Sequence, residues 1–224
     1  MILKRIPDKV LDREGPLKET MRVSVIGACR GAGASFVSAY VLRNGLFEGH
    51  TPEGLRTLCE LGTPYFYQAL GFDRRFAGRT LHGFSSHGKH ELNMEMGYNW
   101  YVKVPGEEYF EKDILRNFYG AAGSMAIFDC SGLNDEPLLF DIAKESDLVY
   151  LVVDPMPTKL ISSEKFIDDV RRICPKAELV VNRFAKGIHR GELKSFLGTG
   201  NYHKIDAMPI EDIYRAEYNC VLPV

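Results

Sequence analysis

The sequence predicts an α/β protein: a doubly wound, mostly parallel sheet with helices on both faces. Two observations predict this fold class. Short apolar runs alternate along the chain with segments of helical periodicity. Several runs, such as residues 148–154 (LVYLVVD), are apolar at nearly every position. A strand of this kind must be covered on both faces, as parallel strands are by their crossover helices.

The expected elements follow one another in the order that β-α-β units require. Strands are expected at residues 22–27, 56–61, 99–104, 125–129, 148–154 and 178–182. Helices are expected at residues 35–44, 65–70, 109–119, 136–145, 162–173 and 191–196. Prolines in the segments DPMPTKL and CPK mark helix boundaries, since proline suits a first helical turn or a helix exit.

The chain of 224 residues is expected to form one domain, residues 21–224, after an N-terminal extension at residues 1–20. Residues 77–97 are polar, contain glycine and show little periodicity, which predicts a long loop or lid. His82, His87 and His90 lie in this segment. We interpret them as solvated loop residues, with a metal site as the alternative.

Composition excludes several classes of protein. The 28 basic and 30 acidic residues give a net charge of −2, so no overall field attracts nucleic acid, and nucleic acid is not an expected partner. No run approaches the ~18 apolar residues of a membrane span, and the N-terminus lacks the apolar core of a signal peptide. The five scattered cysteines form no C-x-x-C pair, which favours free thiols in the cytoplasm.

The segment GACRGAGAS, residues 27–35, has the strand–turn–helix layout of a phosphate-binding loop. Glycines let the backbone approach a phosphate, and the N-terminus of the following helix adds partial positive charge. The Ser35 hydroxyl stands where such loops ligate Mg²⁺. The candidate ligand-binding positions are Arg30, Gly31, Ala32, Gly33, Ala34, Ser35 and Phe36.

The loop departs from the consensus G-x-x-x-x-G-K-[ST] at Ala28 and Ala34. Ala34 occupies the position of the lysine that neutralises the β- and γ-phosphates. Arg30 is the candidate replacement, although a planar guanidinium is not equivalent to an ammonium group. The loop by itself is equally compatible with a tight strand-to-helix turn.

Further polar residues stand at the carboxyl ends of the expected strands, where ligands bind in parallel sheets. Asp129 and Gly132 form a D-x-x-G pattern, in which the aspartate holds Mg²⁺ and the glycine N–H senses the terminal phosphate. Glu60 either caps the turn that follows it or lies near the metal. Asn182 is either a turn residue or a base-binding residue, and Arg183 either borders a base or is solvated.

These motifs together resemble the MinD/ParA family of deviant-Walker ATPases, in the SIMIBI class of P-loop proteins. The family loop reads K-G-G-x-G-K-[ST]; Gly31, Gly33 and Ser35 match it, while Cys29 and Ala34 replace its lysines. The segments RTLCELG, MAIFDCSGL, SDLVYLVVDPMPTKL, AELVVNRF and IDAMPIEDIYRAEYNCVLPV follow in the family's order. The resemblance covers residues 21–224.

The resemblance implies a P-loop fold that binds ATP or ADP with Mg²⁺ held at Ser35 and Asp129. It implies that Glu60 and Asp129 serve catalysis by positioning the metal and the attacking water, and that Asn182 reads the adenine edge. The nearest likeness is to the TadZ/CpaE branch, found with pilus-assembly and secretion machinery.

The absence of both lysines predicts nucleotide binding with weak or absent hydrolysis, in a scaffold or localisation factor. Expected partners are a second copy of the chain or the secretion and pilus machinery. Two alternatives remain open: a pseudo-ATPase interaction module that binds no nucleotide, and an active ATPase that uses Arg30 in place of the lysine.

Overall fold

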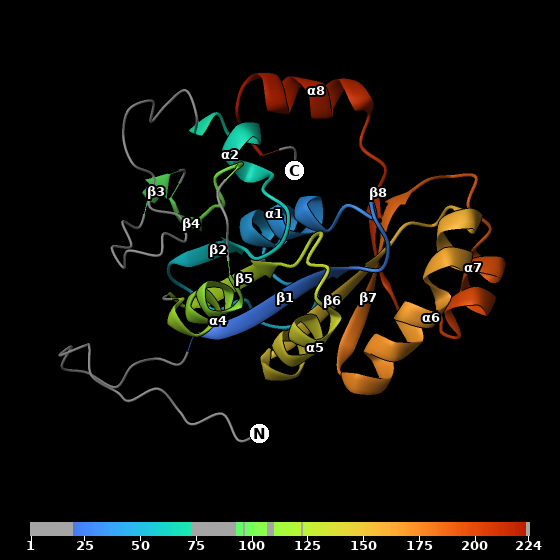
Figure 1. The fold of residues 1–224 in the computed structure, drawn as a ribbon. Helices are drawn as coiled ribbons and strands as arrows, with labels where there is room; N and C mark the ends of the chain where they lie inside the picture. Colours follow the sequence, from blue (N-terminus) through green and yellow to red (C-terminus); the bar gives the residue numbers. More distant parts are fainter. Residues whose placement is uncertain (1–19, 73–92, 96, 107–109, 122, 223–224) are drawn as a thin grey trace.

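One sheet of eight strands organises the residues described by this computed structural model, which are 20–72, 93–95, 97–106, 110–121 and 123–222 (Figure 1). Its strand order is β3-β4-β2-β5-β1-β6-β7-β8. The strands are β1 (Met21–Gly27), β2 (Arg56–Glu60), β3 (Asn93–Glu95), β4 (Tyr98–Tyr101), β5 (Met125–Asp129), β6 (Leu148–Val153), β7 (Ala177–Phe184) and β8 (His203–Asp206). All neighbours pair in parallel except β3, which is antiparallel to β4. The expected mostly parallel sheet is confirmed.

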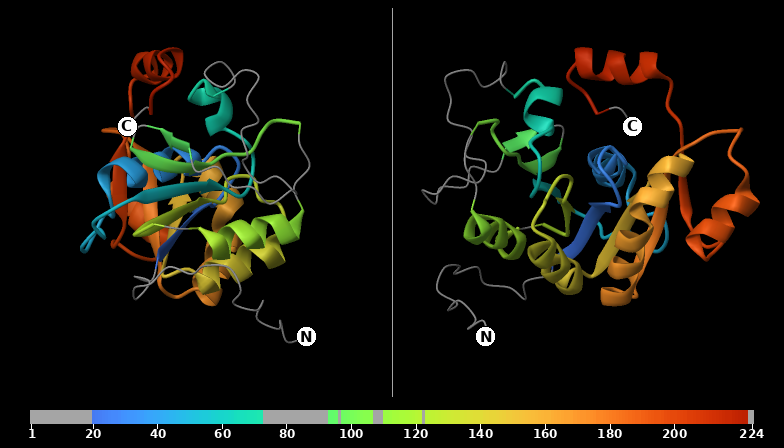
Figure 2. Two further views of the ribbon diagram at one scale, coloured as in Figure 1. Left: turned by 90° about the vertical axis from the view of Figure 1, so that its left-hand side faces the viewer. Right: turned by 45° about the vertical axis from the view of Figure 1, so that its right-hand side comes forward.

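Helices cover both faces of the sheet, which confirms the doubly wound fold (Figure 2). α1 (Ala34–Asn44) packs on one face, and α4 (Glu111–Gly120), α5 (Glu136–Glu145), α6 (Pro157–Ile173) and α7 (Arg190–Leu197) pack on the other. α2 (Phe66–Ala69) and α8 (Ile210–Tyr218) lie beyond the carboxyl ends of the strands (Figure 1). The central strands are therefore enclosed between two helical layers.

The core is divided by the sheet, as the apolar strand sequences require. All five residues of β5 are buried. Met125 and Ile127 pack in the cluster that contains the α1 side chains, whereas Ala126 and Phe128 pack in the cluster that contains the α4–α7 side chains. Because successive strand residues point to opposite faces, a strand in this position must be apolar throughout.

Several elements differ from the sequence-based expectations. α6 begins at Pro157, five residues before the expected start, because proline fits the first helical turn with its fixed φ and absent N–H. β8 and α8 were not expected. β8 is an edge strand in which only Ile205 is buried, so it lacks an apolar run. α8 buries only Ala216, so its sequence pattern reflects a mostly exposed helix.

The expected lid at residues 77–97 lies largely outside the described residues, as do His82, His87 and His90 and the first nineteen residues. The described residues of this segment are Asn93–Glu95, which form strand β3 rather than a loop, and Gly97. All five cysteines are free thiols in the structure, and three of them are buried. In the part of the chain that the structure describes, no helix is long and apolar enough to cross a membrane.

The loops after β2 and β5 are packed backbone to backbone. The N–H of Leu61 donates to the Asp129 carbonyl at 2.8 Å, and the N–H of Thr63 donates to the Ser131 carbonyl at 2.6 Å. A Cβ atom at Gly62 would lie 1.8 Å from the Ser131 carbonyl oxygen. Only glycine therefore fits at position 62, and the two loops form one continuous wall beside β1.

We expect Gly62→Ala to destabilise the protein by about 1–3 kcal/mol, the range typical of overpacking, because the added methyl group meets backbone that cannot rotate away. Gly187→Ala is the matched control, since nothing lies within 4 Å of a Cβ atom at that position. Urea unfolding measures both free energies. Equal stability of the two variants would contradict the close backbone contact.

Candidate functional site

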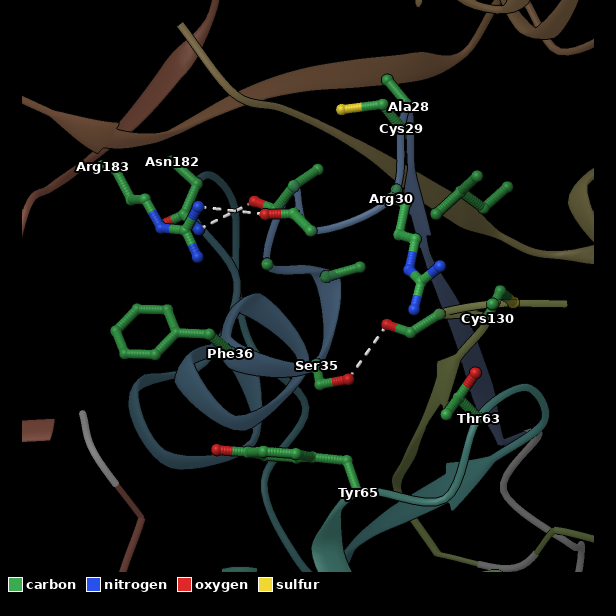
Figure 3. Close-up of a pocket in the computed structure, with 18 of the residues that line it drawn as sticks. Ala28, Cys29, Arg30, Ser35, Phe36, Thr63, Tyr65, Cys130, Asn182 and Arg183 are labelled. Carbon is green, nitrogen blue, oxygen red and sulfur yellow. Dashed lines mark hydrogen bonds between the residues drawn. The ribbon is translucent and has the colours of Figure 1, made fainter. Parts of the chain in front are cut away.

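A cavity of about 1180 Å³ opens at the carboxyl ends of the parallel strands (Figure 3). Its walls are the loops after β1, β2, β5 and β7, and α8 closes one side through Ile210, Ile213 and Glu217. The predicted ligand-binding residues all line it: Arg30, Gly31, Ala32, Gly33, Ala34, Ser35, Phe36, Gly132, Asn182 and Arg183. Glu60 and Asp129 are buried behind the walls.

Three carbonyl groups of the loop after β1 accept hydrogen bonds from side chains of α6 and β7. Lys159 Nζ donates to the Arg30 carbonyl at 3.1 Å, and an Arg183 guanidinium N–H donates to the Gly31 carbonyl at 3.0 Å. The Asn182 amide donates to the Ala32 carbonyl at 2.9 Å. The two bonds from Asn182 and Arg183 reach the loop on the side away from Thr63 and Cys130 (Figure 3).

The N–H groups of the same loop are left available. Ala32 donates its N–H to the Cys29 carbonyl at 3.1 Å. The N–H groups without a hydrogen-bond partner among the described residues are those of Cys29, Arg30, Gly31, Gly33, Ala34, Ser35 and Phe36. Four of them, on Gly33 and the first three residues of α1, stand at the helix N-terminus, where free N–H groups are suited to an anion such as phosphate.

Two glycines shape this array. Gly31 and Gly33 have φ angles of +79° and +89°, in the region that disfavours residues with a Cβ atom. A Cβ atom at Gly33 would lie 2.2 Å from Asn182 Nδ2. Position 33 therefore requires glycine both for its conformation and for the close approach of the Asn182 amide.

A chain of hydroxyl groups leads from the loop to a buried carboxylate. Ser35 Oγ donates to Ser131 Oγ at 3.0 Å, and Ser131 Oγ donates to Asp129 Oδ1 at 2.6 Å. Burial raises the pKa of Asp129, while the hydroxyls of Ser131, Ser35 and Ser38 oppose the shift. The other carboxylate oxygen, Asp129 Oδ2, is buried and has no hydrogen-bond partner among the described residues.

An unpartnered buried carboxylate oxygen beside a serine hydroxyl fits a hard divalent cation such as Mg²⁺. No group of three His, Cys, Asp or Glu side chains gathers within the described ranges. The protein would therefore hold the metal through Ser35 and Asp129, with phosphate oxygens and water as the remaining ligands, which is the usual arrangement for Mg²⁺ at phosphates. Ser131, which lies between the two, was given no role from the sequence.

Glu60 adopts the turn-capping geometry that was one of its two alternatives. Its Oε1 accepts the N–H groups of Tyr65 and Phe66 at 2.6 and 2.7 Å, and its Oε2 accepts the N–H of Lys103 at 2.8 Å. Burial raises the pKa of Glu60 to about 8. The three backbone donors act to lower this pKa, and the charge of Asp129 acts to raise it. Both oxygens are engaged, and a role beside magnesium stays a prediction.

Asn182 and Arg183 brace the loop, and their contact with a base stays a prediction. Arg183 has a φ of 58°, which is strained for a residue other than glycine. Its guanidinium joins the loop to Asp154 Oδ2 at 3.1 Å. Lys159 was missed from the sequence, because nothing in the first turn of α6 marks it as a neighbour of a loop 129 residues earlier.

The loop has Ala34 at the expected lysine position and carries its cation at Arg30. Ala34 is the first residue of α1, is 4% exposed and packs in the core. Arg30 is exposed, and its guanidinium points into the cavity toward the side formed by Cys130 and Thr63 (Figure 3). No acidic side chain in the described part of the chain pairs with Arg30. A cation is therefore present in the cavity, from a different position in the loop.

The raised pKa of Glu60 makes stability depend on pH. Because the folded-state pKa, about 8, lies above the ordinary value of 4.5, the stability that protonated Glu60 contributes is complete below pH 4.5 and is lost as the pH rises toward 8. We expect Glu60→Gln to flatten the fall in unfolding free energy between pH 5 and 8, by up to about 1.4 kcal/mol per pH unit.

Urea unfolding across this pH range measures the slope for the wild type and for Glu60→Gln. The exposed Glu164 on α6 provides the control variant Glu164→Gln, which should keep the slope of the wild type. A wild-type slope that Glu60→Gln leaves unchanged would contradict a carboxyl group that is protonated at neutral pH.

Comparison with known proteins places this geometry in a known fold. The chain matches no protein-family model and no curated protein sequence. Its structure is similar to that of a ParA family ATPase from Chlorobium tepidum TLS, with a TM-score of 0.64 and 12% identity over 92% of this chain and 91% of the other.

Two nucleotide complexes are also similar. One is a protein from Borrelia burgdorferi B31, named for plasmid partition and bound to AMPPNP, with a TM-score of 0.64 and 15% identity over 90% of each chain. The other is the septum site-determining protein MinD of Pyrococcus horikoshii OT3 with Mg-ADP, with a TM-score of 0.58 and 12% identity over 92% of this chain and 88% of the other. At these identities the likeness shows the fold alone: the chain has a P-loop, MinD/ParA-like fold.

Proposed function

We propose that the protein binds ATP or ADP with Mg²⁺ in this cavity, with weak or absent hydrolysis. The observation that carries the proposal is the array of free N–H groups at the start of α1, with the carbonyls of the same loop fastened on its other side. A free array of this kind is an anion site. The similar structures that contain AMPPNP and Mg-ADP support a nucleotide as the anion.

Magnesium is supported by the orphaned oxygen of Asp129 and by its link through Ser131 to Ser35. When bound, the ion would neutralise phosphate charge and tie the nucleotide to the loop after β5. Ser35 would offer a lone pair of its hydroxyl oxygen to the ion, because its proton is already donated to Ser131 Oγ. In the ligand-free protein, the hydrogen bond between these two residues keeps the Ser35 hydroxyl in place.

Weak or absent hydrolysis is supported by two features. Ala34 supplies no ammonium group to stabilise charge on the phosphates. Glu60, the candidate for positioning water, has both carboxylate oxygens engaged with backbone N–H groups. In this proposal nucleotide binding serves a scaffold or localisation role in the cytoplasm, and the TadZ/CpaE likeness extends it to pilus assembly or secretion.

A protein partner is supported by the outer surface of α8. Ile210, Tyr214 and Tyr218 are 71%, 71% and 75% exposed and stand at i, i+4 and i+8 along the helix. Exposed apolar side chains in one stripe are typical of interaction surfaces. The same helix lines the cavity through Ile213, Glu217 and also Ile210 at its start. Tyr65 holds the helix by donating its hydroxyl to Glu217 Oε1 at 3.0 Å.

Titration of the 224-residue protein with ADP and ATP by calorimetry, with and without Mg²⁺, tests the proposal. We expect Mg²⁺ to tighten binding to the wild type by roughly tenfold, a coupling of about 1.4 kcal/mol. In Ser35→Ala this Mg²⁺ effect should be lost. The exposed Ser195 on α7 provides the control variant Ser195→Ala. Absence of binding to the wild type at millimolar nucleotide would overturn the proposal and favour an interaction module without a ligand.

Arg30 carries a second candidate function, because its guanidinium points into the cavity (Figure 3). In an active ATPase that uses Arg30, the wild type would release phosphate from ATP and Arg30→Ala would abolish the release. Under the proposal above, we expect phosphate release from the wild type to be weak or equal to that from Asp129→Asn, and to be the same in Arg30→Ala. Release above this background that disappears in Arg30→Ala would establish the ATPase instead.

A further inference from the structure

Two cations stand directly behind the phosphate loop. Lys159, in the first turn of α6, and Arg183, at the end of β7, each donate to a loop carbonyl, at 3.1 and 3.0 Å. Arg183 also pairs with Asp154, whereas no carboxylate within the described ranges pairs with Lys159. Position 34 has no lysine, but Lys159 and Arg183 place positive charge at the carbonyl groups of the same loop.

The geometry of the peptide group connects these contacts to the cavity. In a trans peptide the C=O and N–H bonds point in opposite directions. The carbonyl of Arg30 shares its peptide with the N–H of Gly31, and the carbonyl of Ala32 shares its peptide with the N–H of Gly33. Because Lys159 holds the Arg30 carbonyl and Asn182 holds the Ala32 carbonyl, these two N–H groups point away from the Lys159 and Asn182 side chains. A charged donor on the carbonyl also polarises the peptide and makes its N–H a stronger donor.

The backbone of Arg183 adopts a conformation that is unfavourable for a residue other than glycine. Its φ of 58° lies in the left-handed region, where a non-glycine residue is strained and persists only when its surroundings hold it. The bonds from its guanidinium to Gly31 and Asp154 provide that hold. The neighbouring Asn182 is fixed in the same way, through its buried amide on the Ala32 carbonyl.

We propose that Lys159 and Arg183 are positioning residues that replace the absent loop lysine from behind the loop. Lys159 fixes the Arg30 carbonyl and so orients the free N–H of Gly31. Arg183 fixes the Gly31 carbonyl, whose peptide carries the Ala32 N–H that is already bonded to Cys29, and so holds the shape of the turn. Both residues add positive charge next to the loop. This inference rests on the proposed nucleotide site. It explains how a loop without its lysine remains suited to a polyanion.

Cys29 offers a reporter of this charge that does not depend on a ligand. It belongs to the same loop and is half-buried. Burial raises the pKa of the Cys29 thiol, while the positive charges of Lys159 and Arg183 lower it and Asp154 raises it. Both cations are therefore close enough to influence a titrating group on the loop.

The binding test uses pyrophosphate and adenosine as separate probes, with Lys159→Met, Arg183→Met and the matched control Lys165→Met, an exposed lysine on the same helix. We expect the first two variants to bind pyrophosphate at least tenfold more weakly than the wild type, and the control to bind it equally. Adenosine affinity should not change, because it has no phosphate. Lys159→Arg should restore pyrophosphate binding, since it returns a cation to the carbonyl.

The thiol test measures the alkylation rate of Cys29 against pH by mass spectrometry of its peptide. We expect Lys159→Met to raise the apparent pKa of Cys29 and Lys165→Met to leave it unchanged. Unchanged Cys29 profiles in both Lys159→Met and Arg183→Met would overturn the inference, as would equal pyrophosphate affinity. If the wild type binds neither pyrophosphate nor nucleotide, the proposed function fails, and the thiol profile still decides the positioning role.

Discussion

The structure of the site depends on one constraint: the carbonyl groups of Arg30, Gly31 and Ala32 each accept a hydrogen bond from a side chain elsewhere in the fold. Their donors come from α6 and β7, more than a hundred residues away in the sequence. Because peptide N–H and C=O groups point in opposite directions, the bonds to the Arg30 and Ala32 carbonyls orient the N–H groups of Gly31 and Gly33 without any contribution from a ligand. The glycines at positions 31 and 33 allow the required backbone angles.

The sheet order makes this hold possible. β1 lies at the centre, between β5 and β6, so the loop that leaves it meets the loop after β5 on one side and the chain after β6 and β7 on the other. The first neighbour provides the hydroxyls and carboxylate of Ser131 and Asp129; the second provides Lys159, Asn182 and Arg183. A polyanion in the cavity would thus lie between the residues proposed to hold a metal and a wall that carries fixed positive charge.

Much of the central fold could be predicted from the sequence, because buried parallel strands such as β5 and β6 are continuous apolar runs. The edge could not: β8 buries only Ile205, and α8 buries only Ala216, so neither has a marked apolar pattern. The loop glycines, Ser35 and Asp129 could be named as candidate site residues because they belong to local sequence motifs. Lys159 and Ser131 were missed, since their roles come from contacts across the fold rather than from spacing along the chain.

Glu60 was identified from the sequence, but its role could not be decided there. A strand-end glutamate allowed two interpretations, and its three backbone donors favour the capping one. The same acid group is also buried beside Asp129, its partner in the β2–β5 register. Two carboxyl groups this deep in the protein make the wall behind the cavity sensitive to protonation and to any cation that binds there.

The most direct test of the central claim, that the loop presents its N–H groups to a phosphate chain, is the amide NMR spectrum of the protein during titration with Mg-ADP. The account predicts that the amide proton signals of Gly31, Gly33 and Ser35 move downfield as hydrogen bonds to phosphate form, while those of the exposed α7 residues stay in place. Loop signals that do not move at millimolar Mg-ADP would contradict it.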